Sequence, residues 1–211
     1  MNRTHVLMAD DHTMLLDGLV TLVNREVNVI GVARDGRALI DMAKELRPDV
    51  IVTDISMPDL NGIDAVRILQ KEATSTRFLF LSMHSDLPLI KEAFRAGASG
   101  YLLKVCSAEE CVMAIQCVAR GKTYITPLLA GDLISTLLTA GPQETSRQAT
   151  LTLRQREVLQ LLAEGKTMKE VAASLKISTR TTESHKYEIM RQLGLRTTAE
   201  LVRYAVQIKL V

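Results

Sequence analysis

The sequence predicts an α/β domain built on a doubly wound parallel sheet, followed by a smaller all-α domain. Two observations support this prediction. Between Thr4 and about Arg120, strand-like apolar runs alternate with amphipathic helical runs, whereas only helical patterns follow Leu151. Because the strand-like runs are apolar almost throughout, we expect a parallel sheet with helices on both faces. The strand order that we assume for it is 2-1-3-4-5, one of the two common doubly wound orders.

Strands and helices are expected to alternate five times in the α/β domain. The predicted strands are His5–Ala9, Val29–Ala33, Val50–Thr53, Phe78–Ser82 and Gly100–Leu103. The predicted helices lie near Thr13–Arg25, Arg37–Leu46, Gly62–Lys71, Leu87–Ala96 and Ala108–Ala119. Ser107 and Glu110 have the spacing of a capping box, which marks the start of the last of these helices.

The stretch from Gly121 to about Thr150 differs in composition from both of its neighbours. Prolines and glycines interrupt it, and the part TAGPQETSRQAT is polar. We predict a short helix at roughly Pro127–Leu138 followed by a linker. The chain is therefore expected to consist of an α/β domain at 1–122, a linker with a short helix at 123–149 and an all-α domain at 150–211.

Helix starts in the all-α domain are marked by Thr residues followed three positions later by Gln or Glu, the spacing of a capping box. These pairs are Thr152 with Gln155, Thr167 with Glu170, and Thr197 with Glu200. A fourth helix is expected near Ser178, after the turn Lys176-Ile177, and Gly165 and Gly194 occupy positions typical of helix ends. Four short helices, two of them joined by a tight turn, fit a helix-turn-helix.

The composition excludes several other classes of protein. The 211 residues are 47% hydrophobic, but no run of about 18 uncharged apolar residues suits a membrane span. The stretch MNRTHVLMADD becomes acidic too early for a secretory signal peptide, so we expect a cytoplasmic protein with no membrane partner. Cys106, Cys111 and Cys117 fall in one predicted helical region with a spacing that fits no zinc site, so we expect buried or inert thiols.

The net charge of +2 conceals an uneven distribution along the chain. From Gln148 onward there are 11 Lys and Arg against 6 Asp and Glu, whereas the preceding residues hold 15 against 18. An acidic body joined to a basic C-terminal domain favours nucleic acid as the partner of that domain.

Polar side chains stand where several predicted strands end. Asp10 and Asp11 follow the first strand, Asp54 follows the third, and Ser82 and Lys104 mark the ends of the fourth and fifth. In an open parallel sheet, ligands bind beyond the carboxyl ends of the strands, so we expect these side chains to share one crevice. Clustered carboxylates repel one another, and such a site either raises a pKa or holds a cation. Oxygen ligands favour Mg²⁺ over zinc.

With these residues at its strand ends, the segment 4–120 resembles the receiver domain of two-component response regulators, which has a flavodoxin-like (βα)5 fold. The resemblance implies that Asp54 accepts a phosphoryl group from a cognate sensor histidine kinase. It also implies that Asp11, Asp54 and the backbone carbonyl of Ser56 hold Mg²⁺, and that Asp10 acts through metal-bound water.

The same resemblance implies roles for three residues around the phosphoryl group. Lys104 would offer a cation to the phosphoryl oxygens, and the Ser82 hydroxyl would hydrogen-bond to one of them. After phosphorylation, Ser82 would move toward Asp54, and Tyr101 would fill the space that Ser82 leaves. The phosphate would thereby rearrange the face formed by the fourth and fifth strands.

The stretch LTLRQREVLQLLAEGKTMKEVAASLKISTRTTESHKYEIMRQLGL resembles the LuxR/NarL-type helix-turn-helix, and the likeness runs from about Leu151 to the end. Independently, helical periodicity places Thr182, Ile189 and Leu193 on one buried stripe of a helix at Thr179–Leu193. The residues on its opposite face, expected in the major groove, are Arg180, Ser184, Tyr187 and Arg191, with Glu183 at the edge of that face. Those expected to contact phosphates are Lys166, Lys169, Lys186 and His185.

Taken together, these features favour a response regulator transcription factor in which phosphorylation of Asp54 controls homodimerisation and binding to double-stranded DNA. The alternative is a phosphorylation-independent DNA-binding regulator whose receiver serves only for docking. A phosphoaspartate hydrolase is a poor fit, because haloacid-type phosphatases need a second acid two residues after the nucleophile, and that residue here is Ser56. We therefore expect no enzyme beyond a receiver that catalyses its own phosphorylation and dephosphorylation.

Overall fold

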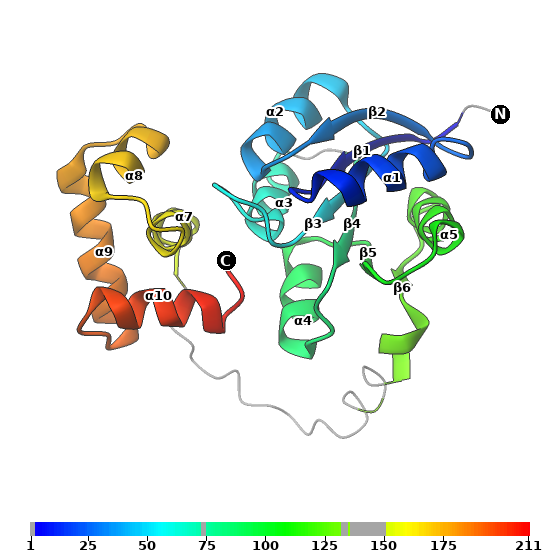
Figure 1. Cartoon of the computed structure of the whole chain (residues 1–211). Helices are drawn as coiled ribbons and strands as arrows, with labels where there is room; N and C mark the ends of the chain where they lie inside the picture. Colours follow the sequence, from blue (N-terminus) through cyan, green and yellow to red (C-terminus); the bar gives the residue numbers. More distant parts are fainter. Residues whose placement is uncertain (1–2, 73–74, 132–134, 136–150) are drawn as a thin grey trace. The chain divides into compact units, whose positions relative to one another are not determined.

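The computed structural model describes residues 3–72, 75–131, 135 and 151–211. The chain divides into two compact units, Met1–Gly141 and Pro142–Val211. Figure 1 shows a mixed α/β unit from the blue N-terminus to green, and a helical unit from yellow to red. Each unit has its own buried core. Among the described residues, no helix has the length and apolar character needed to cross a membrane.

The first unit is built on a parallel sheet with the strand order β2-β1-β3-β4-β5-β6 in the described part of the chain. The strands are β1 (His5–Ala9), β2 (Asn28–Ala33), β3 (Val50–Asp54), β4 (Arg77–Ser82), β5 (Gly100–Leu103) and β6 (Tyr124–Ile125). The helices between them are α1 (Thr13–Val23), α2 (Gly36–Leu46), α3 (Gly62–Gln70), α4 (Leu87–Ala96) and α5 (Ala108–Ala119). The predicted fold class is confirmed, and so is the order 2-1-3-4-5 of the first five strands.

Helices cover both faces of this sheet, as Figure 1 shows. Successive residues of a strand point to opposite faces, so the odd and even positions of β1 enter different cores. Leu7 packs in the core beneath α2, α3 and α4, whereas Val6 and Met8 pack in the core beneath α1 and α5. A sheet buried on both sides explains why its strands are apolar at nearly every position.

A sixth strand, β6, was not predicted from the sequence. Its two residues pair with β5, with Gly100 opposite Tyr124 and Tyr101 opposite Ile125. The hydroxyl of Tyr124 donates to Glu110 Oε1 at 3.1 Å. The predicted capping box at α5 is therefore only half formed. Ser107 Oγ accepts from the backbone N–H of Glu110, but the Glu110 carboxylate accepts from the Tyr124 hydroxyl and not from the backbone N–H of Ser107.

Part of the predicted linker belongs to the first unit. Residues 127–131 are helical, and Leu129 is buried in the core beneath α2, α3 and α4. The rest of the predicted helix Pro127–Leu138, apart from residue 135, and the linker that follows it lie outside the described residues.

The second unit consists of four helices within residues 151–211: α7 (Leu153–Ala163), α8 (Met168–Leu175), α9 (Thr179–Leu193) and α10 (Thr198–Gln207). The predicted helix starts are confirmed, because Thr152, Thr167 and Thr197 each form a complete reciprocal capping box. Ser178 caps α9, and the tight turn before it places Lys176 in the left-handed region, with φ 53°. A turn of this kind between α8 and α9 is the helix-turn-helix arrangement.

Candidate functional site

The carboxyl ends of β1, β3, β4 and β5 bring the predicted pocket residues together. The strand register places these strand ends at the same edge of the sheet: Ala9 pairs with Thr53, Asp54 with Leu81, and Ser82 with Leu103. Asp10 and Lys104 are the next residues along β1 and β5 and therefore reach the same edge. We call Asp10, Asp11 and Asp54 with Lys104 the acidic pocket.

Lys104 is the centre of the acidic pocket. Its Nζ lies 2.8 Å from Asp10 Oδ2 and 2.8 Å from Asp54 Oδ2. Burial raises the pKa of the Asp54 carboxyl, and the charge of Asp10 adds to this, although Lys104 opposes it. Burial by itself would lower the pKa of Lys104, but its hydrogen bonds to Asp10 and Asp54 raise it. One buried ammonium thus neutralises charge on two carboxylates that would otherwise repel each other.

The backbone around Asp54 is tightly enclosed. Asp54 Oδ1 accepts a hydrogen bond from the N–H of Ile55 at 2.7 Å, and the N–H of Gly62 donates to the Ile55 carbonyl at 2.8 Å. A Cβ at position 62 would collide with the carbonyl oxygen of Asp54. Ser56 is half-buried on this loop, two residues after Asp54. The loop therefore holds the carboxylate at the rim of the sheet with little freedom.

Sequence reasoning missed His12, which follows Asp11 directly. Its Nδ1 lies 3.1 Å from Asp10 Oδ1 and 2.9 Å from Asp11 Oδ1. Asp10, Asp11, His12 and Asp54 each offer one ligand atom, and these four atoms lie within 4.8 Å of one another. The position of His12 at the same strand end as the two aspartates was the available clue.

The chemistry of this donor set is compatible with a divalent cation. Three carboxylates are hard oxygen ligands of the kind that Mg²⁺ takes, usually with several waters retained. Asp10 is buried, whereas the side chain of Asp11 is 36% exposed and open to a hydrated ion.

Ser82 and Tyr101 lie together beside the acidic pocket, and both are fully buried. The Ser82 Oγ accepts from the N–H of His84 at 3.1 Å, and the Tyr101 hydroxyl donates to the His84 carbonyl at 2.8 Å. Burial raises the pKa of Tyr101 to about 12. The Tyr101 hydroxyl therefore has a backbone partner inside the first unit. The movement of Ser82 and Tyr101 that the resemblance implies on phosphorylation stays a prediction.

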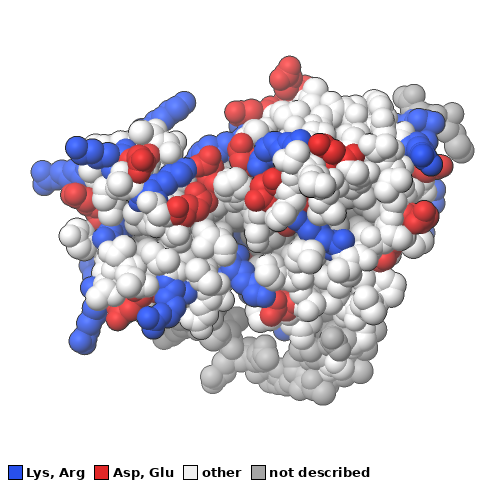
Figure 2. All heavy atoms as spheres, in the orientation of Figure 1, with Lys and Arg blue, Asp and Glu red and all other residues white. Residues whose placement is uncertain are grey.

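The second unit exposes the predicted face of α9. Thr182 and Ile189 are buried and Leu193 is half-buried, so the predicted apolar stripe is confirmed. Arg180, Glu183, Ser184, Tyr187 and Arg191 are exposed, and Tyr187 is 67% exposed. Among the predicted phosphate contacts, Lys169 is exposed and Lys166, His185 and Lys186 are half-buried. Figure 2 shows Lys and Arg side chains projecting from the part of the molecule that contains α8 and α9.

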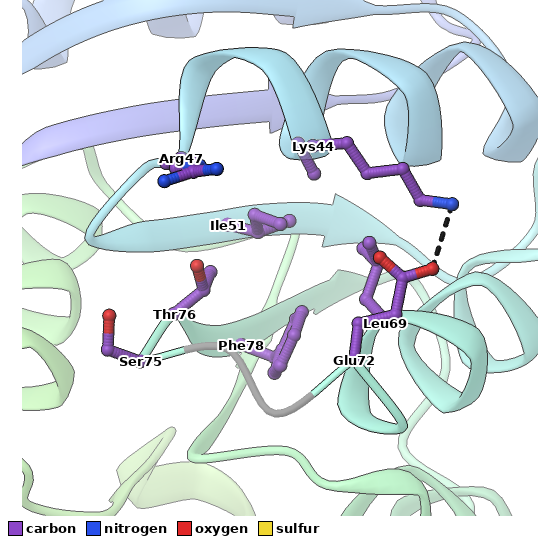
Figure 3. A pocket seen from close by; sticks show the side chains of 9 residues that line it. Lys44, Arg47, Ile51, Leu69, Glu72, Ser75, Thr76 and Phe78 are labelled. Carbon is purple, nitrogen blue, oxygen red and sulfur yellow. Dashed lines mark ion pairs between the residues drawn. The ribbon is translucent and has the colours of Figure 1, made fainter.

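A separate hollow of about 430 Å³ lies at the opposite, amino edge of the sheet (Figure 3). Ile51 and Phe78, which pair between β3 and β4, line it together with Arg47. Lys44 Nζ and Glu72 Oε1 form an ion pair of 2.8 Å across it, and both side chains remain partly exposed. It contains none of the residues of the acidic pocket, so the two features are independent.

Comparisons with known proteins agree with both halves of this description. Residues 6–116 match the family described as response regulator receiver domain, and residues 149–205 match the bacterial regulatory proteins of the luxR family. The transcriptional regulatory protein MctR of Rhizobium johnstonii is 34% identical over 206 residues, which cover 97% of this chain and 94% of MctR.

Solved structures of response regulators are similar to this chain over nearly all of its length. The response regulator RcsB of Salmonella typhimurium is similar with a TM-score of 0.66 and 27% identity, covering 99% of both chains. A structure of two RcsB dimers bound to two parallel DNAs is similar with a TM-score of 0.58 and 26% identity, covering 97% of this chain and 98% of that one.

Proposed function

This chain belongs to the response regulators of transcription that join a receiver domain to a LuxR-type domain, and we propose that Asp54 is its phosphoacceptor. The observation that carries this proposal is the position of Lys104 Nζ, 2.8 Å from both Asp54 and Asp10 at the rim of the sheet. A sensor histidine kinase is the expected donor.

In the proposed reaction, an oxygen of the Asp54 carboxylate attacks phosphorus in line with the leaving nitrogen of the kinase histidine. The bond from phosphorus to Asp54 forms as the bond to that nitrogen breaks. Lys104 then shifts its contact from the Asp54 carboxylate to a phosphoryl oxygen, and the buried Ser82 hydroxyl donates to another. The receiver would catalyse only this step and the later hydrolysis, in which water attacks the phosphoryl group, the bond from phosphorus to Asp54 breaks and phosphate leaves.

Mg²⁺ is the proposed cofactor of this reaction. Asp11, Asp54 and the backbone carbonyl of Ser56 would hold it, with Asp10 in its outer sphere. When bound, it would neutralise charge on the incoming phosphoryl group. The oxygen-rich donor set and the exposed edge at Asp11 support this assignment.

The second unit is proposed to bind double-stranded DNA with α9 in the major groove. Arg180, Glu183, Ser184 and Tyr187 would contact base edges, with Arg191 further along the same helix. Lys166, Lys169, Lys186 and His185 would contact phosphates. The complex of RcsB dimers with DNA supports DNA as the partner and a homodimer as the DNA-binding form. Since both the DNA and the kinase domain of a sensor are reached from the cytoplasm, we place the protein there.

The alternative, a regulator that ignores phosphorylation, leaves the buried polar groups of the acidic pocket without a use. Burying charged groups costs free energy that an apolar rim would not cost. That cost favours a working phosphoryl site over a receiver kept only for docking.

The phosphoacceptor is tested by labelling the full chain with acetyl phosphate and Mg²⁺, followed by mass spectrometry of the intact protein. We expect one phosphoryl group on the wild type and none on Asp54→Asn. Asp41→Asn, an exposed position on α2, is the matched control and should label normally. Equal labelling of Asp54→Asn and the wild type would overturn the assignment.

A further inference from the structure

Helices α1 and α5 pack side by side on one face of the sheet (Figure 1), and their solvent side carries large apolar side chains. These side chains are Met14, Leu15 and Leu22 of α1, with exposed fractions of 90%, 40% and 48%, and Met113 of α5, with 55%. We call them the α1–α5 patch. Single exposed apolar residues are common on protein surfaces, but a group shared by neighbouring helices is typical of a contact surface.

The helical repeat determines which side of α1 carries Leu15 and Leu22. The two residues are about two turns apart, so they lie on the same side of the helix. Asp17 lies on the opposite side, where its Oδ1 is 3.1 Å from Nη2 of Arg34, the residue that follows β2. Since β2 is at the edge of the sheet, Leu15 and Leu22 lie on the side of α1 that is turned toward α5.

Gly18 lies between Leu15 and Leu22 in the middle of α1, and it is exposed. A glycine inside a helix costs about 0.8–1 kcal/mol relative to alanine. At Gly36 the fold explains the glycine, because a Cβ there would collide with the carbonyl oxygen of Leu60. At Gly18, a Cβ would meet no atom within 4 Å outside its chain neighbours and the backbone of its own helix. The packing of the described chain therefore does not require this glycine, whereas the close approach of a second helix backbone would.

The solvent side of α5 carries charges of opposite sign at its two ends. Glu109 and Arg120 are both exposed and lie about three turns apart, so they share one stripe of the helix with Met113 between them. α1 and α5 each follow a strand of one parallel sheet and therefore run in the same direction. A two-fold axis across both helices would place α5 antiparallel to its counterpart in a second copy, with Glu109 of each copy facing Arg120 of the other.

The same two-fold axis suits the apolar residues of α1. With α1 antiparallel to its counterpart, Leu15 of each copy lies opposite Leu22 of the other, and the two Gly18 residues lie near the point where the helices cross. We propose that the α1–α5 patch, together with Gly18, is the surface on which a second copy of this chain docks. The inference rests on the homodimer of the proposed function, which the DNA-bound dimers of the similar protein RcsB support, and adds the surface that forms it.

The charge pattern favours a second copy of this chain over a different partner. A contact between identical surfaces must be complementary to itself, and a stripe that is acidic at one end and basic at the other meets this condition when it is turned around. A docking surface for a sensor kinase needs no such self-complementarity. If a kinase were the partner, substitutions in the α1–α5 patch would leave dimerisation of the chain unchanged.

Sedimentation velocity of the full chain with beryllofluoride and Mg²⁺ measures the dimer. Gly18→Lys is the main variant, because its side chain would begin in open space and lysine is a better helix former than glycine. It should be at least as stable as the wild type in urea, while its dimer dissociation constant rises about tenfold or more. Glu45→Gln, at an exposed position of α2, changes the net charge by the same amount and should dimerise normally.

Charge reversal tests the pairing of Glu109 with Arg120. Glu109→Arg and Arg120→Glu should each weaken the activated dimer about fivefold or more, because like charges would then face each other. The double variant should dimerise within about twofold of the wild type, because opposite charges would meet again. The two positions are too far apart on one helix to compensate each other within a single chain.

Normal dimerisation of the activated Gly18→Lys variant, or a double variant that dimerises no better than the single ones, would overturn the inference. If these variants still accept a phosphoryl group from acetyl phosphate on Asp54, the phosphoacceptor of the proposed function stands and only the docking surface fails. A wild type that is labelled at Asp54 but stays monomeric on activation would overturn the homodimer, and this inference with it.

Discussion

Lys104 and Asp54 form a buried ion pair, with Nζ 2.8 Å from Oδ2 and side chains only 3% and 5% exposed. The same ammonium lies 2.8 Å from Asp10 Oδ2. Lys104 thus has two roles. It stabilises the carboxylates before phosphorylation, and it is close enough to contact the phosphoryl group afterwards. These two roles can be separated by experiment.

Lys104→Met should destabilise the receiver strongly when no divalent ion is present. Two buried carboxylates would lose their cation, which should cost about 3–5 kcal/mol of unfolding free energy. Urea unfolding in EDTA measures this loss, and added Mg²⁺ should restore part of it. Lys44→Met is the control, since its ion pair with Glu72 is half exposed and should contribute less than about 1 kcal/mol. Equal losses in the two variants would contradict this account.

Tyr101 should make stability fall in alkaline solution. Its pKa is raised by burial from 10.0 to about 12, so the folded state favours the neutral phenol. The stabilisation is therefore complete below pH 10.0 and is lost as the pH rises toward about 12. Relative to Tyr101→Phe, the wild type should lose about 2 to 3 kcal/mol over this range. A difference in unfolding free energy that does not change with pH would refute the prediction.

Gly62→Ala should damage the site because a Cβ there would collide with the carbonyl oxygen of Asp54. We expect a loss of about 1–3 kcal/mol in thermal or urea unfolding, together with weaker acetyl phosphate labelling. Gly18→Ala is the matched control, since no atom other than its neighbours in the chain and the backbone of its own helix lies within 4 Å of its Cβ position on the exposed side of α1. That variant should be more stable by about 0.8–1 kcal/mol and label normally. Normal stability and labelling of Gly62→Ala would contradict this prediction and would show that the loop can move to accommodate a Cβ.

Base and phosphate contacts should respond differently to mutation. Arg180→Ala should cost about 1–3 kcal/mol of binding free energy on the preferred site and relax the preference at one base pair. Lys169→Ala should weaken binding to all sequences alike and reduce the slope of log affinity against log salt by about 1. Lys122→Ala, an exposed position in the first unit, should change neither quantity. Fluorescence anisotropy across a salt series measures both, and identical behaviour of the two variants would contradict the assignment.

The fold could be predicted largely because strong local patterns agree with it. β1, β5, α4 and α5 have the predicted bounds, since apolar runs and helix caps define their ends. By contrast, β6 has only two residues, Tyr124 and Ile125, too few for any periodicity, and depends on pairing with β5. The Glu110 carboxylate accepts a hydrogen bond from Tyr124 of this strand and does not cap α5. This tertiary contact cannot be predicted from the spacing of Ser107 and Glu110 alone.

The site was predictable at the level of strand ends and less so at the level of side-chain contacts. Parallel strands had to bring Asp10, Asp54 and Lys104 to one edge, whatever their partners. The contact of His12 with both neighbouring carboxylates depends on the backbone angles at the start of α1, which a sequence pattern does not specify. The buried hydroxyl of Tyr101 likewise depends on the His84 carbonyl, a backbone group without a sequence signature.

The central claim is that phosphorylation of Asp54 controls DNA binding by the second unit. The most direct measurement uses the full chain and a DNA site selected with the beryllofluoride-activated protein, and compares affinity and oligomeric state with and without beryllofluoride and Mg²⁺. We predict tighter binding and dimer formation on activation of the wild type, and neither change in Asp54→Asn. A wild type whose DNA affinity and oligomeric state are both unaltered by beryllofluoride would contradict the account.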